Sequence, residues 1–251
     1  MKILIAGYGY VGKAQELVFK DYHETAIYDP YLGYENDWLN VDAVIVCVST
    51  PARRDGSCEM TNVFEVIDMA PDVPILIKST ISVEGWEMLA DTFPNKQICF
   101  SPEFLRAAHW KEDARTKHIY LGGNCTNFWS DLFLQVLDKP NISIENPADL
   151  VAAKALRNSF LALKVSFFNQ VFDYCKAYKL DTDAVIKTII EDQRIGSSHS
   201  TVTSERGFGG HCLPKDVSAI IRSAQRNNTR LTLLEEANNY NQSIRSGKDQ
   251  T

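Results

Sequence analysis

A glycine-rich turn near the start of the chain constrains the fold more than any other feature. The apolar run Lys2–Ala6 leads directly into Gly7-Tyr8-Gly9-Tyr10-Val11-Gly12, and a helical pattern continues from there to Lys20. The first glycine permits a tight turn, the second lets the backbone approach a ligand, and the third lets the helix pack closely on the strand. Free amides at the start of the helix favour an anion. The segment therefore predicts a strand, a turn and a helix arranged around a pyrophosphate.

The next predicted strand, Thr25–Tyr28, ends in an acid at the spacing that a dinucleotide site requires. Asp29 lies 22 residues after Gly7. A carboxylate at this point accepts hydrogen bonds from ribose hydroxyls and disfavours the 2′-phosphate of NADP. The alternative is a glycine turn followed by an incidental aspartate. We predict NAD as the cofactor, bound by residues of the turn and by this acid: Gly7, Gly9, Tyr10, Val11, Gly12 and Asp29.

The first part of the chain alternates β-rich runs with amphipathic helical stretches. This alternation predicts a parallel sheet with helices on both faces. We therefore expect a Rossmann-like, doubly wound NAD-binding domain over residues 1–146. Its further strands are expected at 43–48, 74–78, 97–101, 118–121 and 142–145, and its further helices at 62–70, 83–92 and 128–137.

The chain changes character after Asn146, a capping residue followed by a proline suited to a first helical turn. Nothing breaks the helical pattern from Pro147 to Leu180, which predicts a rod of roughly 50 Å. Shorter helices are expected at Thr182–Asp192, Pro214–Asn227 and Leu231–Arg245. The sequence thus predicts an α/β domain followed by an all-helical central domain, residues 147–251, with one long connecting helix.

The long helix carries an apolar stripe whose residues recur at spacings of three and four: Leu156, Phe160, Leu163, Phe167, Val171 and Tyr174. A stripe of this length exposed to water favours aggregation unless a partner covers it. We therefore expect a homodimer that pairs through this helix.

A second glycine-rich loop surrounds Cys212. Three glycines occupy four positions in Gly207–Gly210, so the backbone there can wrap a ligand closely. Cys212 lies just before Pro214, at the expected start of a helix, where the helix dipole and nearby Lys215 favour a thiolate. A buried structural cysteine beside a glycine turn is the alternative.

Two polar residues of the long helix are candidates for the same chemistry. Lys154 and Asn158 are four residues apart and share a helix face. Beside a thiolate, this pair could hold a water or stabilise an oxyanion. Taken alone, Lys154 is expected to be a solvated surface lysine.

Several segments resemble the UDP-glucose/GDP-mannose dehydrogenase family and occur in its order. The blocks Ser101-Pro102-Glu103-Phe104-Leu105-Arg106 and Gly207–Asp216 are the most specific. The other matching segments are Gly7–Gly12, Val48–Pro51, Ser79-Thr80, Asn158–Asn169 and Asp192–Gly196. The resemblance implies a four-electron oxidation of the primary alcohol of a nucleotide sugar to the acid, with two NAD consumed. In that scheme the first hydride transfer gives an aldehyde, the cysteine adds to it to form a thiohemiacetal, and a second hydride transfer leaves a thioester, which water hydrolyses.

The family scheme also implies catalytic roles for individual residues. Cys212 is the nucleophile, Lys154 and Asn158 stabilise the developing oxyanion, and Asp216 helps to order a water. The remaining catalytic residues implied by the resemblance are Glu103, for thioester hydrolysis, and Thr80, which holds a water or the cofactor.

Binding residues follow from the same resemblance. It adds Thr50, Pro51 and Thr80 to the residues that bind NAD. It also implies contacts with the nucleotide-sugar substrate through Glu103, Phe104, Leu105, Lys154, Asn158, Arg194, Phe208, Gly209 and Gly210.

Three departures from the family pattern shape our expectations. The segment between Asp29 and Val41 is short, so the sheet should lack or reduce one element. After Arg106, Ala107–Trp110 replaces a Glu-Gly pair of the family, which removes an acid. The chain also ends at Thr251, where the family has a second Rossmann-like domain that holds the substrate nucleotide. We therefore expect a nucleotide sugar to bind weakly, or only when another protein completes the site.

Two alternatives stay open at this point. One is a catalytically weak NAD-binding subunit that needs a partner protein, and the other is a dehydrogenase of a smaller alcohol. The net charge of −6 gives no support to a nucleic-acid partner. There is no signal-peptide pattern, no run long enough to span a membrane and no CxxC pair for a metal. We expect a cytoplasmic protein without a metal site.

Overall fold

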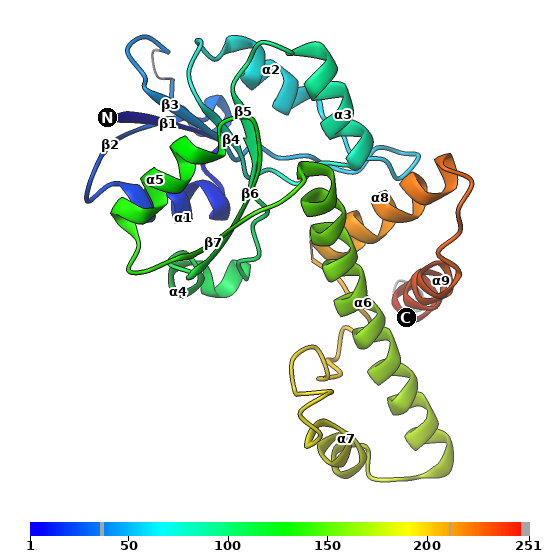
Figure 1. Cartoon of the computed structure of the whole chain (residues 1–251). Coiled ribbons are helices and arrows are strands. Elements are labelled where there is room, and N and C mark those ends of the chain that lie inside the picture. The colour runs from blue at the N-terminus through cyan, green and yellow to red at the C-terminus, as the bar shows by residue number, and fades with distance from the viewer. Residues whose placement is uncertain (36–37, 211, 247–251) are drawn as a thin grey trace. The chain divides into compact units, whose positions relative to one another are not determined.

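The computed structural model describes residues 1–35, 38–210 and 212–246 (Figure 1). The chain divides into two compact units. Unit 1 comprises Met1–Arg53 and Cys58–Lys154, and unit 2 comprises Arg54–Ser57 and Ala155–Thr251. The border between them falls inside the long helix. The expected domain boundary after residue 146 stays a prediction.

Unit 1 is built on one sheet whose strand order is β2-β1-β3-β4-β5-β6-β7. Pairing is parallel from β2 across to β5 and again between β6 and β7. This architecture confirms the predicted Rossmann-like α/β class. The strands are β1 Lys2–Ala6, β2 Glu24–Tyr28, β3 Ala43–Val46, β4 Ile75–Ile77, β5 Ile98–Phe100, β6 His118–Gly123 and β7 Asn141–Ile144.

Helices cover both faces of this sheet. In Figure 1, α2 (Thr61–Met69) and α3 (Val83–Thr92) lie on one side, and α1 (Tyr10–Phe19) and α5 (Thr126–Val136) lie on the other. Alternate residues of β1 serve the two cores: Leu4 packs on the α2–α3 side and Ile5 on the α1–α5 side. Because both faces are buried, the strands are apolar at successive positions, as parallel strands usually are.

One strand pair departs from the predicted parallel arrangement, because β6 runs antiparallel to β5. Cys99 pairs with Gly123 and Phe100 with Gly122. Parallel neighbours need a crossover, usually a full helix. The connection from β5 to β6 contains only a 3-10 turn, Ala107–His109, and the four-residue helix α4, Trp110–Asp113. The chain therefore begins β6 at the end of the sheet where β5 stops, and β6 runs back in the opposite direction.

The short segment after Asp29 leaves β2 at the edge of the described sheet. A doubly wound sheet of the common type has a further strand beyond this position. Here the described residues form a 3-10 turn, Pro30–Leu32, closed by a bridge between Asp29 and Tyr34. Within the described part of the chain, β2 pairs with β1 alone.

Unit 2 is helical. The single long helix that we predicted is α6, Pro147–Tyr178, whose first residues belong to unit 1. Asn146 caps it by accepting from the Ala148 amide at 2.9 Å. The other helices are α7 Thr182–Ile190, α8 Cys212–Arg226 and α9 Thr232–Ser246. Helices α6, α8 and α9 and the loop at Phe208 supply a small core of Ala162, Phe208, Val217 and Leu234.

None of the described helices combines the length and the apolar character that crossing a membrane takes.

Candidate functional site

The turn between β1 and α1 has the geometry of a phosphate cradle. Gly7 has φ +92°, and a Cβ there would lie 2.6 Å from the carbonyl carbon of Cys47. A Cβ on Gly12 would lie 2.0 Å from the Gly7 oxygen, whereas one on Gly9 would meet nothing within 4 Å. The turn therefore packs tightly on the protein at Gly7 and Gly12, whereas the space beside Gly9 is free. No side chain caps α1 and no acid lies in its first turn, so its amides and positive dipole end suit an anion.

Asp29 is held directly beside this turn. The Tyr8 amide donates to Asp29 Oδ2 at 2.8 Å. The backbones of Asp29 and Tyr34 exchange two hydrogen bonds, at 2.9 and 3.0 Å. The Tyr8 ring makes an edge contact with Tyr34, at 5.3 Å between centroids. Its hydroxyl donates to Glu16 at 2.5 Å, a bond that raises the pKa of Tyr8 to about 12. The predicted cofactor acid therefore lies at a fixed place next to the glycines.

The loops that follow β3 and β4 are joined to each other. Thr50 is buried, and its hydroxyl donates to the carbonyl oxygen of Thr80 at 2.6 Å. The Ser79 hydroxyl donates to the Val48 carbonyl at 2.8 Å. In doubly wound sheets, ligands bind outside the carboxyl ends of the strands. Thr50 and Thr80 lie at those ends.

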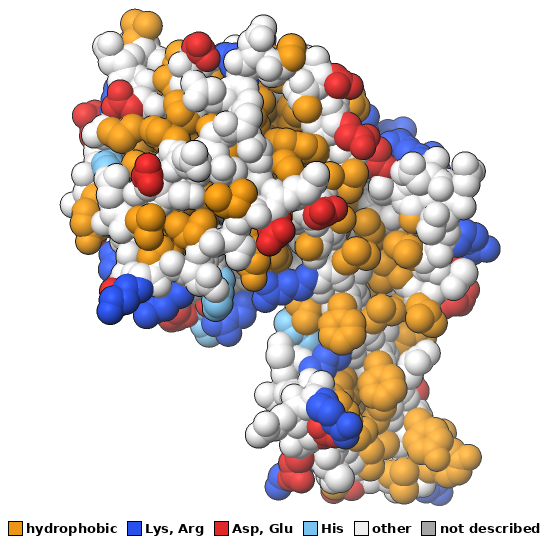
Figure 2. All heavy atoms as spheres, viewed as in Figure 1, with side chains coloured by type: hydrophobic (Ala, Val, Ile, Leu, Met, Phe, Trp, Pro, Cys, Tyr) orange, Lys and Arg blue, Asp and Glu red, His pale blue; other side chains and the backbone are white. Residues whose placement is uncertain are grey.

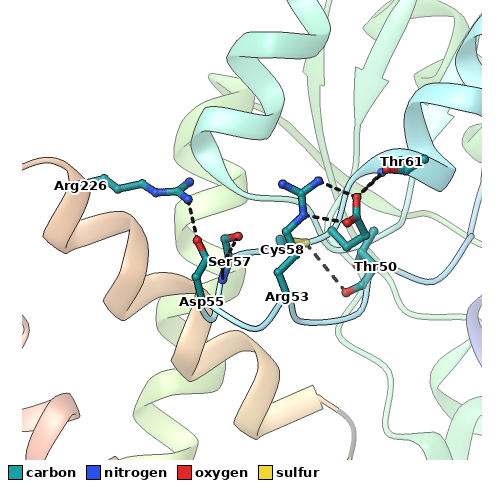
Figure 3. Close-up of polar contacts among 8 residues, drawn as sticks. Thr50, Arg53, Asp55, Ser57, Cys58, Thr61 and Arg226 are labelled. Atoms are coloured by element: carbon teal, nitrogen blue, oxygen red, sulfur yellow. Dashed lines mark hydrogen bonds and ion pairs between the residues drawn. The ribbon is translucent and has the colours of Figure 1, made fainter.

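The stretch after Pro51 is held at several points, which Figure 3 shows in close-up. Arg53 contacts Glu59 through two hydrogen bonds, at 2.7 and 2.8 Å, and Glu59 also accepts from Thr61 at the start of α2. In unit 2, Asp55 accepts from Ser57 and pairs with Arg226 at 3.1 Å. The Ser57 hydrogen bonds, assisted by the arginine, lower the pKa of Asp55 to about 2.

Glu103 belongs to a buried ion pair that sequence reasoning missed. Lys78 Nζ lies 3.2 Å from Glu103 Oε2, and the two side chains are 4% and 10% exposed. Gln15 donates to the same oxygen at 3.2 Å, and the amides of Phe104 and Leu105 donate to Oε1 at 2.9 and 3.3 Å. Lys78 also contacts the Ser101 hydroxyl at 3.1 Å. A lysine that ends an apolar strand directly before Ser79-Thr80 was the available signal.

Lys154 is 6% exposed, so the expectation for this residue taken alone, a solvated surface lysine, is wrong. Leu150 and Val151, which precede it, pack in the α2–α3 core of unit 1, so this turn of α6 is buried. Burial raises the pKa of the Cys47 thiol, and the positive charges of Lys78 and Lys154 partly oppose this effect. Cys47, directly after β3, therefore lies within electrostatic reach of both lysines.

In unit 2, α6 and α8 meet through two predicted site residues. Asn158 Nδ2 donates to Asp216 Oδ2 at 2.6 Å, and Lys215 Nζ lies 3.0 Å from Asp216 Oδ1. Asp216 is 2% exposed. Cys212 is the first residue of α8 and its side chain is exposed. The helix begins at the cysteine itself, so the thiol has the helix N-terminus as its immediate surroundings.

Other predicted substrate residues of unit 2 lie apart from these contacts. Arg194 is 89% exposed and pairs with Asp192 at 2.5 Å. Its turn is held by Lys164, which donates to the carbonyls of Ile195 and Gly196. The Phe208 side chain is 2% exposed and packs in the small core. Across the described residues, no group of three or more His, Cys, Asp and Glu side chains is placed to hold a metal ion.

The chain was compared with known proteins and solved structures. Residues 150–243 match the model of the UDP-glucose/GDP-mannose dehydrogenase family, central domain. UDP-glucose 6-dehydrogenase of Campylobacter jejuni is 26% identical over 268 residues, which cover 88% of this chain and 67% of the relative. The enzyme of the same name from Rickettsia bellii is 31% identical, over 86% of this chain and 51% of the relative.

The solved structure of a UDP-glucose dehydrogenase from Pyrobaculum islandicum has the same fold. It superposes with a TM-score of 0.84 at 22% identity, over 96% of this chain and 68% of that one. This chain thus spans about half to two thirds of the length of the proteins that it matches. The glycine turn with its acid, the Cys212 loop and these matches agree: the chain belongs to the UDP-glucose/GDP-mannose dehydrogenase family.

Proposed function

We propose that this chain oxidises the primary alcohol of a nucleotide sugar of the UDP-glucose type to the acid, with NAD as the acceptor. The relatives that it matches carry the name UDP-glucose 6-dehydrogenase, which supports a dehydrogenase of this class. The observation that carries the proposal is the exposed Cys212 thiol at the first position of α8, one turn from the buried carboxylate of Asp216, which accepts from Asn158.

NAD, when bound, would accept one hydride, so that two NAD molecules in succession would serve the two oxidation steps. The open cradle at Gly9 and the uncapped start of α1 fit its pyrophosphate, and the fixed carboxylate of Asp29 fits the ribose hydroxyls. Tyr10 and Val11 begin that helix, and Gly7 and Gly12 shape the turn. Thr50, Pro51 and Thr80 lie at the carboxyl ends of the strands, at the same end of the sheet as the glycine turn.

Cys212 acts as the nucleophile. The alcohol first loses a hydride and its hydroxyl proton to become an aldehyde. The Cys212 sulfur then adds to the aldehyde carbon while the aldehyde oxygen takes a proton, and the resulting thiohemiacetal loses a hydride and its hydroxyl proton to become a thioester. Water then attacks the thioester carbonyl, the C–S bond breaks, and the acid leaves with the thiol regenerated. Lys154 and Asn158 stabilise the oxyanion that develops at each addition, because a cation and an amide N–H both favour it. Asp216 orders a water for the hydrolysis.

The other predicted residues take part in hydrolysis and substrate binding. Glu103 assists the attack of water on the thioester, and Thr80 holds a water or the cofactor near the reacting carbon. The backbone of Phe104 and Leu105, which donates to Glu103, lines the substrate side. Contacts with the sugar nucleotide are made by Arg194, whose guanidinium is exposed, and by the loop of Phe208, Gly209 and Gly210.

The protein acts as a homodimer that pairs through α6. Several members of the apolar stripe are open to solvent: Phe160 is 65%, Phe167 53% and Tyr174 59% exposed. Figure 2 shows hydrophobic side chains gathered along this helix. A two-fold pairing in which each copy covers the stripe of the other removes this surface from water.

NADH formation against a panel of UDP- and GDP-sugars tests the proposed function. The wild-type chain should reduce two NAD for each acid formed, and Cys212→Ala should give no acid. Turnover of simple primary alcohols with none of any nucleotide sugar would contradict the substrate class. A ratio of one NADH per sugar would contradict the thioester route.

A further inference from the structure

The backbone that precedes the cysteine loop is fixed at every residue from Arg206 to Phe208. The Arg206 carbonyl accepts from Arg245 Nη1 at 2.9 Å, and the Gly207 amide donates to Asn169 Oδ1 at 3.0 Å. The Phe208 amide donates to Asn241 Oδ1 at 2.7 Å, and Asn241 Nδ2 donates back to the Phe208 carbonyl at 3.0 Å. Three consecutive residues are thus attached to α6 and α9 by side chains.

The side chain of Arg206 also attaches this backbone segment to α6. Its Nε donates to Asn169 Oδ1 at 2.8 Å, its Nη2 pairs with Asp173 at 2.7 Å, and its guanidinium lies 4.4 Å from the ring centroid of Phe172. Arg206 has φ +55°, a conformation that costs a residue with a side chain free energy unless its surroundings impose it. The contacts with α6 impose it here.

Asp173 is shared between two elements. Its second oxygen accepts from the Tyr240 hydroxyl of α9 at 2.5 Å. Burial and this hydrogen bond raise the pKa of Tyr240 to about 12, so its hydroxyl keeps the proton that it donates. Arg206 and Asp173 therefore join α6, α9 and the loop into one network.

Asn241 is the most specific member of this network. It is 5% exposed, and its carboxamide gives the backbone of Phe208 one acceptor and one donor, as a neighbouring strand would. A Cβ on Gly207 would lie 2.2 Å from Asn241 Oδ1, so the loop approaches this side chain as closely as a glycine allows.

Gly209 and Gly210 follow these residues, and a Cβ on Gly209 would lie 2.9 Å from Arg245 Nη1. Gly210 has φ +77°, and a Cβ there would meet nothing within 4 Å. Three residues separate Phe208 from Cys212. Phe208 and Val217 of α8 pack in the same small core. The position of Phe208 therefore sets where Gly209 and Gly210 begin.

We propose that Asn241, with Asn169 and Arg206, is a positioning residue that fixes the sugar-binding loop and the orientation of Cys212. This inference rests on the proposed function for its kinetic consequence, but not for its structural one. The Asn241 carboxamide acts through the backbone of Phe208 and does not touch the reacting atoms. Because an error of about 1 Å in positioning can cost a hundredfold in rate, the effect should appear in turnover.

The experiment compares Asn241→Asp with Asn239→Asp, the same change at an exposed position of α9. In the first variant the introduced carboxylate has no N–H to give and faces the Phe208 carbonyl with a negative charge, whereas the control changes only a solvated side chain. We expect the rate of Cys212 alkylation by iodoacetamide to change several-fold in the first variant and not in the control. In the same variant kcat for a nucleotide sugar should fall by roughly tenfold to a hundredfold, while the KM for NAD stays within about twofold.

Equal alkylation rates and equal kcat in the two folded variants would overturn the proposal. If circular dichroism shows that Asn241→Asp does not fold, Arg206→Lys replaces it, with Arg206→Met as its partner. Lysine keeps the charge near Asp173, so it should restore more of the wild-type alkylation rate than methionine, and equal rates would again contradict the proposal. A wild-type chain that oxidises no nucleotide sugar would refute the proposed function, while the alkylation comparison would still decide the positioning role.

Discussion

Asp29 acts at the scale of a single residue, because one carboxylate decides between two cofactors. Its position is fixed by the Tyr8 amide and by the bridge to Tyr34, so it cannot easily move away from a 2′-phosphate. We predict that NAD binds at least tenfold more tightly than NADP. Asp29→Ser should weaken NAD by about 1.5–3 kcal/mol, the range for hydrogen bonds to a charged group. Calorimetric titration of both cofactors measures this, with the exposed Asp21→Ser as the control, and tighter binding of NADP would refute it.

Cys212 gives the second prediction at this scale. Cys212→Ser replaces the thiol by a much poorer nucleophile at neutral pH. Acid formation should fall by at least roughly a thousandfold, whereas the Kd for NAD should stay within about twofold, because the cradle lies in unit 1. Cys212 should also be the first thiol alkylated, since Cys58, Cys99, Cys125 and Cys175 are all buried. Peptide mass spectrometry after brief iodoacetamide treatment identifies the first cysteine to react. If another cysteine reacts first and the serine variant keeps its activity, Cys212 is not the nucleophile.

At the scale of elements, the Lys78–Glu103 pair joins the end of β4 to the loop after β5. Lys78→Met leaves a buried carboxylate without its cation, which should lower the free energy of unfolding by about 3–5 kcal/mol. Removing both charges, in Lys78→Met with Glu103→Leu, should recover much of this loss because no unpaired charge remains buried.

Urea unfolding measures these differences. The exposed pair Lys117–Asp138 provides the matched control, since Lys117→Met should cost less than about 1 kcal/mol. Additive losses from the two single substitutions of the buried pair would show that Lys78 and Glu103 are not coupled.

At the scale of the whole molecule, the exposed stripe of α6 predicts how copies associate. Phe160→Glu with Phe167→Glu places two charges on the stripe, which should shift the protein from dimer to monomer in light scattering at micromolar concentration. Lys176→Glu changes an exposed charge near the end of the same helix and should leave the dimer intact. A monomeric wild-type protein, or a double variant that stays dimeric, would mean that the stripe is covered in another way.

The features that the sequence alone determined are those that depend on residues close together in the chain. Apolar runs and their alternation with amphipathic stretches placed all seven strands of the described sheet, because burial on both faces demands such runs. The glycine turn and the spacing to Asp29 located the cradle, since only glycine fits at Gly7 and Gly12. An unbroken helical pattern after a capping asparagine predicted α6 from its first residue, and the predicted end at Leu180 lies two residues beyond the observed end at Tyr178.

Tertiary structure alone decided which distant residues meet. Asn158 and Asp216 are 58 positions apart in the chain, and Phe208 and Asn241 are 33 apart. No local pattern encodes such a pair. The direction of β6 and the burial of Lys78 and Lys154 likewise depend on the connection and packing of whole elements. A side chain's chemistry is readable from its own residue, but its charge, partner and exposure are set by neighbours that only folding brings to it.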